Sequence, residues 1–216
     1  MKTKFCLGFQ MIDVPQSINC LRINLELFKQ LQTCTSFSEP LDTLRFALSQ
    51  SADEGIALEF GVYSGRTLQL IADRFPNKTF GFDSFDGLPE DWREGFPAGT
   101  FSTLNVPEIE GAACIKGLFQ ETLDGFIARM LDEGLTELSF IHLDADLYYS
   151  TKFCLNKLND FIKPGCVIVF DEFMNYPGFE NHEYLAYMEW SLEFERVSVP
   201  IAFTDWHEQM AFKVVK

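Results

Sequence analysis

The chain has 216 residues, of which 47% are hydrophobic and 23 are phenylalanine, so it can bury one sizeable core and is not disordered. Its formal net charge of -15 opposes binding to a nucleic-acid backbone or an anionic membrane, because like charges repel. The sequence has neither a long apolar stretch nor a secretory signal, and its six cysteines form no CxxC pair. We therefore expect a cytoplasmic enzyme or binding protein with reduced thiols.

The first 52 residues carry helix patterns and no strand pattern. Apolar residues recur every three or four positions from Ser17 to Gln32, and a second short helix is expected after Pro40. We predict an N-terminal helical extension or lid over residues 1–52 and one α/β domain over residues 53–216. The amphipathic extension is compatible with a homodimer.

Strand and helix patterns alternate in the rest of the chain. The expected strands are IALEF, KTFGFD, ACIKG, LSFIHLD, GCVIVFD, FERVSVPIAF and MAFKVVK. Apolar runs without period-two alternation indicate strands covered on both faces, and intervening helices indicate parallel crossovers. The last two runs are too close for a helical crossover and should form an antiparallel hairpin. The predicted fold is a doubly wound, mostly parallel seven-stranded α/β sheet with a reversed C-terminal strand.

Ligands of an open parallel sheet bind beyond the carboxyl ends of its strands. The first strand ends in LEFGVYSGRT, where Gly61 and Gly65 allow a ligand to approach the turn. Glu59 would repel a phosphate and could attract an ammonium or sulfonium group. The second strand ends at Asp83, about where nucleotide-binding folds accept hydrogen bonds from ribose. These features favour an adenosine ligand without a pyrophosphate, and a plain turn beside a solvated acid is the alternative.

Four carboxylates follow two later strands that should be adjacent. IHLDAD carries Asp144 and Asp146, and CVIVFDE carries Asp171 and Glu172, with no lysine or arginine in either stretch. Such a cluster repels itself unless it is protonated or holds a cation, and all-oxygen ligands favour Mg²⁺. Asp146 is either a fourth ligand or a base beside the metal. The irregular segment over residues 86–111 is long enough for a lid or binding loop.

Four blocks of the sequence carry a family resemblance. LEFGVYSGRTL, GFDSFDGLPEDW, FIHLDADLYYST and PGCVIVFDEF resemble the macrocin O-methyltransferase family of metal-dependent sugar methyltransferases, within the class I S-adenosylmethionine-dependent methyltransferases. The resemblance implies a Rossmann-like methyltransferase fold. It also implies Mg²⁺-dependent methyl transfer from S-adenosylmethionine to a hydroxyl of a small molecule, such as a sugar or a sugar-bearing natural product.

The same resemblance assigns roles to individual residues. It places Mg²⁺ on Asp144, Asp171 and Glu172, and it makes Asp146 the general base acting with Asp144. The family more often has two aspartates where this chain has Asp171 and Glu172. The implied cofactor contacts are Glu59, Gly61, Tyr63, Ser64, Gly65, Asp83, Ser84, Gly117, Phe119 and Asp144.

Two other functions are compatible with the sequence. Asp144-Ala-Asp146 has the DxD form of a metal-dependent glycosyltransferase, although the chain lacks a basic set of residues to hold a diphosphate. The chain could also be a non-catalytic ligand-binding protein of the same fold. The intact acid cluster weighs against that function, because unused buried charges destabilise a protein.

Overall fold

The structure is a computed structural model that describes residues 3–7, 10–14 and 29–216. Near the N-terminus, β1 (Thr3–Leu7) and β2 (Gln10–Val14) pair as an antiparallel hairpin. The helix predicted over residues 17–32 lies largely outside the described residues, and residues 29–31 are helical. The sequence therefore predicted no strand in a region that contains this hairpin.

The main sheet has eight strands in the order β3-β9-β10-β8-β7-β4-β5-β6. The bounds of its strands are β3 (Thr35–Phe37), β4 (Ile56–Phe60), β5 (Thr79–Asp83), β6 (Ala112–Lys116), β7 (Leu138–Leu143), β8 (Ile162–Phe170), β9 (Ser198–Thr204) and β10 (Met210–Val214). Only β10 is antiparallel to its neighbours. The mostly parallel sheet and its reversed C-terminal strand are confirmed. The eighth strand, β3, was missed because three residues show no periodicity.

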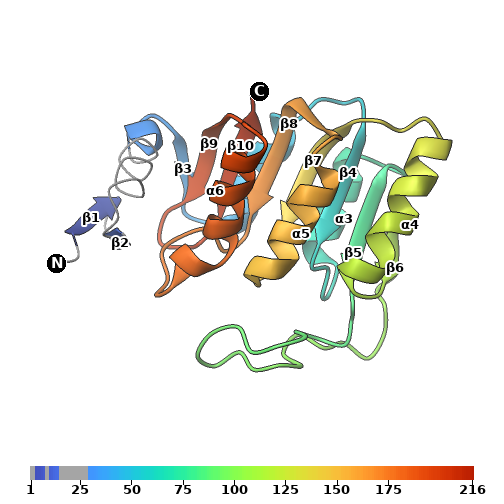
Figure 1. Cartoon of the computed structure of the whole chain (residues 1–216), viewed down its shortest axis with the longest axis horizontal. Helices are drawn as coiled ribbons and strands as arrows, with labels where there is room; N and C mark the ends of the chain where they lie inside the picture. Colours follow the sequence, from blue (N-terminus) through green and yellow to red (C-terminus); the bar gives the residue numbers. More distant parts are fainter. Residues whose placement is uncertain (1–2, 8–9, 15–28) are drawn as a thin grey trace.

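Helices cover both faces of this sheet (Figure 1). Their bounds are α2 (Pro40–Ser49), α3 (Arg66–Arg74), α4 (Phe119–Asp132), α5 (Tyr148–Leu158), α6 (Glu183–Glu193) and the short 3-10 helix η1 (Phe179–Asn181). Helices α2 and α3 share a core with one face of the sheet, and α4, α5 and α6 share a core with the other. No helix in the described ranges combines the length and apolarity that a bilayer crossing needs.

The central strands are buried because both of their faces pack against helices. In β7, Phe140 faces the α2 and α3 layer, whereas Ile141 faces the α4 to α6 layer. One ionisable side chain interrupts the apolar run of β4 and one that of β7, namely Glu59 and His142, and both are completely buried. They are register partners on adjacent strands, which places them side by side.

The lid loop, residues 84–111, connects β5 to β6 without a helix or strand, as its composition predicted. Figure 1 shows it reaching beyond the carboxyl ends of the parallel strands. The loop is folded back on itself, since Leu88 N donates to Thr100 O at 2.9 Å and Gly99 N donates to Leu88 O at 2.8 Å. It is therefore positioned to cover the edge of the sheet at which ligands bind.

Replacing Phe212 with alanine should cost about 3–5 kcal/mol of unfolding free energy. The Phe212 ring joins β10 to α6, because it stacks on Tyr187 with ring centroids 4.6 Å apart and also packs on Phe173 at 5.0 Å. Chemical denaturation measures the loss. Leu192→Ala on α6 is the control, since that side chain is 69% exposed and its loss should change stability by less than about 0.5 kcal/mol. Equal losses would contradict this account of the core.

Candidate active site

The site begins where β4 ends, at Gly61. This residue has φ of 93°, and a Cβ added to it would lie 1.8 Å from the carbonyl oxygen of Asp144. Asp144 N in turn donates to Phe60 O at 2.9 Å. Glycine is required here because the turn after β4 touches the backbone that carries an acid of the predicted metal site.

Asp83 holds this turn in place. Its Oδ2 accepts hydrogen bonds from the backbone N–H groups of Val62 and Tyr63, both at 2.8 Å, and its Oδ1 accepts one from Phe85 N at 2.7 Å. Asp83 also lines a cavity at the carboxyl ends of the strands. The residue predicted to bind ribose thus also fixes the backbone around the adjoining ligand space.

That cavity has a volume of about 570 Å³ and unites most of the predicted site. Seven of the ten predicted cofactor residues line it: Gly61, Tyr63, Asp83, Ser84, Gly117, Phe119 and Asp144. Asp146, Asp171 and Glu172 line it as well. The other lining residues come mainly from the lid loop, which the sequence predicted as a lid or binding loop, and from the start of α4: Gly87, Leu88, Pro89, Phe101, Leu118, Gln120, Glu121, Ala145 and Ser150.

Glu59, Ser64 and Gly65 are not part of the cavity wall. Gly65 is the N-cap of α3 and packs against Ile109 of the lid loop. The Glu59 carboxylate is completely buried, and its Oε1 lies 2.8 Å from His142 Nδ1. The register of β4 and β7 brings both side chains to the same face of the sheet, where Glu59 contacts His142, and the direct cofactor contact of Glu59 stays a prediction.

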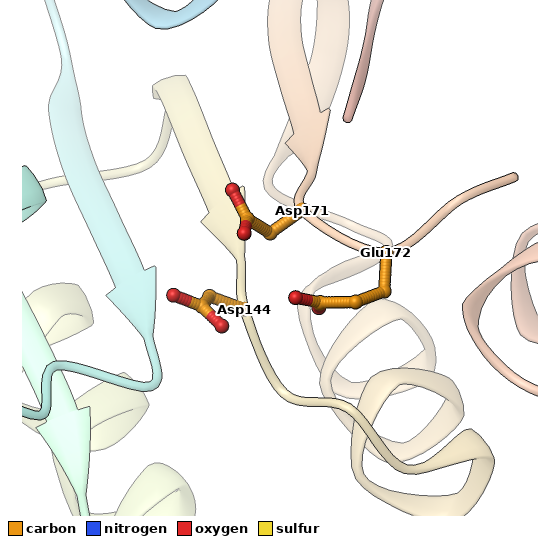
Figure 2. Close-up of side chains that lie close together, drawn as sticks. All are labelled: Asp144, Asp171 and Glu172. Carbon is orange, nitrogen blue, oxygen red and sulfur yellow. The ribbon is translucent and has the colours of Figure 1, made fainter. Parts of the chain in front are cut away.

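Three acids converge between the ends of β7 and β8 (Figure 2). One oxygen from each of Asp144, Asp171 and Glu172 lies within 4.8 Å of the others. Glu172 Oε2 is buried and has no hydrogen-bond partner in the described structure. An oxygen of this kind needs a proton or a cation. The three side chains fit a divalent cation held by oxygen ligands, such as Mg²⁺.

Crowding changes the proton affinity of these acids. Burial, together with the charge of Asp171, raises the pKa of Asp144 and of Glu172 well above the usual range. The same causes raise the pKa of Asp146 to about 7, although the charge of Arg93 opposes them. Without a cation, part of the cluster is therefore protonated near neutral pH.

Asp171 is the exception because donors surround it. Its Oδ1 lies 3.4 Å from His142 Nε2 and accepts a hydrogen bond from Gln209 Nε2 at 2.5 Å. Burial favours the neutral acid and is the largest single influence, but the contacts with His142, Gln209 and Glu172 together outweigh it and lower the pKa of Asp171. Although burial disfavours the imidazolium, the contacts with Asp171 and Glu59 raise the pKa of His142 well above 6.5. The buried Glu59 and His142 pair therefore keeps Asp171 ionised.

Sequence reasoning missed the role of the residues that support the acids. Glu59 was predicted as a cofactor contact and not as the partner of His142, although a polar residue in each of two adjacent buried strands indicates a pair. Gln209 and the buried Glu183, whose carboxylate accepts a hydrogen bond from Glu172 N, had none, because loop and helix contacts between distant segments leave no local pattern.

Arg93 fastens the lid loop to the rest of the site. Its guanidinium donates to both carboxylate oxygens of Glu208, at 2.8 and 3.1 Å. The same group lies over the rings of Trp92 and Tyr176, at 3.9 and 4.4 Å from their centroids. Glu208 immediately precedes Gln209, so the lid loop and Asp171 are held by neighbouring residues ahead of β10.

These features define the fold and site of a class I methyltransferase: a doubly wound sheet with one reversed strand, a glycine turn after β4, an acid after β5, and a cavity between them. The methyltransferase domain family matches residues 58–173, more than half of the chain. The chain belongs to this family.

Solved structures share the fold. The calicheamicin methyltransferase CalS11 matches with a TM-score of 0.63 at 21% identity over 92% of this chain and 86% of its own. The O-methyltransferase NovP matches at 0.58 and 17% identity, over 82% and 79% of the two chains. An O-methyltransferase from Bacillus cereus, in complex with SAH, matches at 0.53 and 15% identity, over 94% and 93%. No curated protein sequence matches this chain.

Replacing Arg93 with alanine should open the lid loop. The bidentate pair with Glu208 is mostly shielded from water, and charged hydrogen bonds of this kind contribute about 1.5–3 kcal/mol. Cleavage after Glu90 or Glu94 by a glutamyl endopeptidase should become about ten to a hundred times faster. Lys116→Ala is the control, because the pair of Lys116 with Asp86 is exposed. Equal cleavage of both variants would show that Arg93 does not hold the loop.

The metal-stripped protein should lose stability as the pH rises from 6 to 8. The pKa values of Asp144, Asp146 and Glu172 are raised in the folded chain, so it keeps protons that the unfolded chain releases. Each such proton changes stability by about 1.4 kcal/mol per pH unit. The raised pKa of His142 acts in the same direction, because its stabilising charge is lost as the pH rises through that value.

Denaturation in the presence of a chelator checks this trend. Asp146→Asn should flatten it, since one titrating group is removed. Mg²⁺ at a hundredfold excess over its Kd should restore about 2.7 kcal/mol at pH 8. A stability that increases from pH 6 to 8 without metal would contradict the proton affinities assigned to the cluster.

Proposed function

We propose that the protein is an S-adenosylmethionine-dependent, Mg²⁺-dependent O-methyltransferase that acts on a hydroxyl of a small molecule, in particular a sugar or a sugar-bearing natural product. One observation carries this proposal: a single lidded cavity joins the glycine turn and Asp83 to the acids Asp144, Asp171 and Glu172. Membership of the methyltransferase domain family supports a methyl group as the group that is transferred.

The cofactor end of the cavity suits an adenosine ligand without phosphates. Gly61 has no side chain to fill the cavity. The Asp83 carboxylate has remaining lone pairs that can accept hydrogen bonds from ribose hydroxyls. Gly117, just after β6, and Phe119, the first residue of α4, provide a wall for the adenine. No lysine or arginine is among the described residues that line the cavity, which disfavours a nucleotide diphosphate and hence the glycosyltransferase alternative.

Asp144, Asp171 and Glu172 would hold the metal ion. When bound, a divalent cation lowers the pKa of a coordinated hydroxyl and so makes a poor nucleophile reactive near neutral pH. The pair of Glu59 and His142 and the amide of Gln209 keep Asp171 ionised and oriented toward this position. Asp171 therefore remains available as a ligand at a pH at which its neighbours retain protons.

Asp146 is the proposed proton acceptor. Its backbone has φ of 58°, in the left-handed region, and its carboxylate lines the cavity beside the metal acids. Without a cation the pKa of Asp146 is about 7, and a bound cation would lower it, so that the carboxylate is ionised and can accept a proton near neutral pH. The acceptor oxygen forms a bond to the methyl carbon as the bond from carbon to sulfur breaks, and the hydroxyl proton passes to Asp146. The lid loop excludes water during this step.

Two observations bear on the choice of acceptor. CalS11 is described as a TDP-rhamnose 3'-O-methyltransferase of calicheamicin biosynthesis, which concerns that protein alone. Leu88, Pro89 and Phe101 of the lid loop give the cavity apolar surface, as suits the carbon face of a sugar or polyol. The cytoplasmic location and the homodimer stay predictions, and sedimentation over a range of concentrations would test the latter.

Calorimetric titration tests the proposal. The metal-stripped protein should bind S-adenosylmethionine and its demethylated product, and it should bind Mg²⁺ separately. Asp144→Ala should abolish Mg²⁺ binding and turnover. Asp146→Asn should keep Mg²⁺ binding but lower turnover by about 10²–10⁴-fold, because it removes a general base.

Two results would overturn the proposal. If neither the cofactor nor its product binds, the cavity serves another ligand, and binding of a nucleotide sugar would then favour the glycosyltransferase. If Asp144→Ala turns over at the normal rate, the acids do not form the reaction centre.

A further inference from the structure

Glu183 is a buried carboxylate that the proposed mechanism does not use. It is the first residue of α6 and has no exposed surface. It is absent from the wall of the cavity, so it does not reach a bound ligand. None of the ion pairs in the described part of the chain involves it. A buried carboxylate without a cationic partner is costly unless hydrogen-bond donors surround it.

Three donors surround this carboxylate, and they come from separate segments. Glu183 Oε1 accepts hydrogen bonds from Thr151 Oγ1 of α5 at 3.1 Å and from Ala145 N at 3.4 Å. Glu183 Oε2 accepts one from Glu172 N at 3.1 Å. The two oxygens therefore bridge the loop after β7 and the turn after β8.

The two bridged segments are those that carry the acid cluster. Ala145 lies between Asp144 and Asp146, and the backbone of Glu172 follows Asp171 directly. The hydrogen bonds to Ala145 N and Glu172 N limit the rotation of both backbones. They therefore set the direction in which the acid side chains leave the chain.

We propose that Glu183 is a positioning residue that fixes the spacing of the two metal-ligating segments by bridging them with one carboxylate. This inference rests on the proposed function, since it concerns the same metal ion. Glu183 acts through Ala145 and Glu172 and contributes no ligand itself. Outer partners of this kind typically change metal affinity or activity by about 10–100-fold when they are removed.

Glu183→Gln is the decisive variant because it keeps the shape of the side chain. The side chain of glutamine has only one acceptor oxygen. If this oxygen accepts the hydrogen bond from Glu172 N, the amide nitrogen faces the N–H of Ala145, and two donors then oppose each other. We expect the Kd for Mg²⁺ to rise at least about tenfold, with the Kd for the demethylated cofactor within about threefold of normal. Thr151→Val should weaken Mg²⁺ binding less than Glu183→Gln does. Thr151→Ser should bind Mg²⁺ normally, because serine keeps the hydroxyl.

Amide hydrogen exchange in the metal-free protein provides a readout independent of metal and turnover. In Glu183→Gln, the N–H of Ala145 or of Glu172 should lose protection, and Glu183→Ala should expose both if it folds. Glu189→Gln is the matched control on the same helix, since Glu189 is 43% exposed and bonds only outward to Tyr148 and Lys152. It should change neither the exchange nor the Kd for Mg²⁺.

The outcomes separate the two proposals. Failure of the wild-type protein to bind Mg²⁺ would overturn the proposed function. Hydrogen exchange alone would then decide whether Glu183 bridges Ala145 and Glu172. Normal Mg²⁺ binding by wild type and by Glu183→Gln, with unchanged exchange, would overturn the inference. An equal loss of Mg²⁺ and cofactor binding, with general unfolding, would also overturn it, because it would assign Glu183 a purely structural role.

Discussion

The mutual repulsion of the carboxylates at the ends of β7 and β8 is the constraint on which the site depends. Asp144, Asp146, Asp171 and Glu172 share a low-dielectric space, where like charges repel far more strongly than they do in water. The fold offsets this repulsion in two ways. It surrounds Asp171 with the donors of His142 and Gln209, and it leaves the others with raised pKa values that a cation would lower. The proposed metal site would thus combine Asp171, which stays ionised, with several acids that a cation would ionise.

The same strands relate the metal side of the cavity to its cofactor side. The close approach of Gly61 to the carbonyl of Asp144 makes the turn after β4 and the acid after β7 a single rigid unit. Asp83 fixes that turn through the N–H groups of Val62 and Tyr63. Gly61 meets Asp144 through backbone atoms, and the Asp83 carboxylate holds backbone N–H groups, so the position of the turn relative to the backbone of Asp144 is closely fixed.

Most of the fold and the positions of the main acids could be predicted, since both follow from local patterns. Apolar runs with turn residues mark β4 to β10, and an acid at a strand end must lie at the ligand edge of a parallel sheet. The direction of Glu59 could not be predicted, because it depends on the register between β4 and β7. The supporting roles of Glu183 and Gln209 could not be predicted for a similar reason, since their contacts join segments far apart in the chain. The strand β3 is too short to carry a pattern.

The reversed direction of β10 has a consequence for how the protein matures during synthesis. Because this strand runs against its neighbours, its amino end lies at the ligand edge, where Glu208 holds the lid loop and Gln209 holds Asp171. These contacts can form only after residues 198–214 have left the ribosome and entered the sheet. A nascent chain that has already folded β4 to β8 therefore carries an incomplete, self-repelling acid cluster, and catalytic competence arrives as one of the last steps of folding.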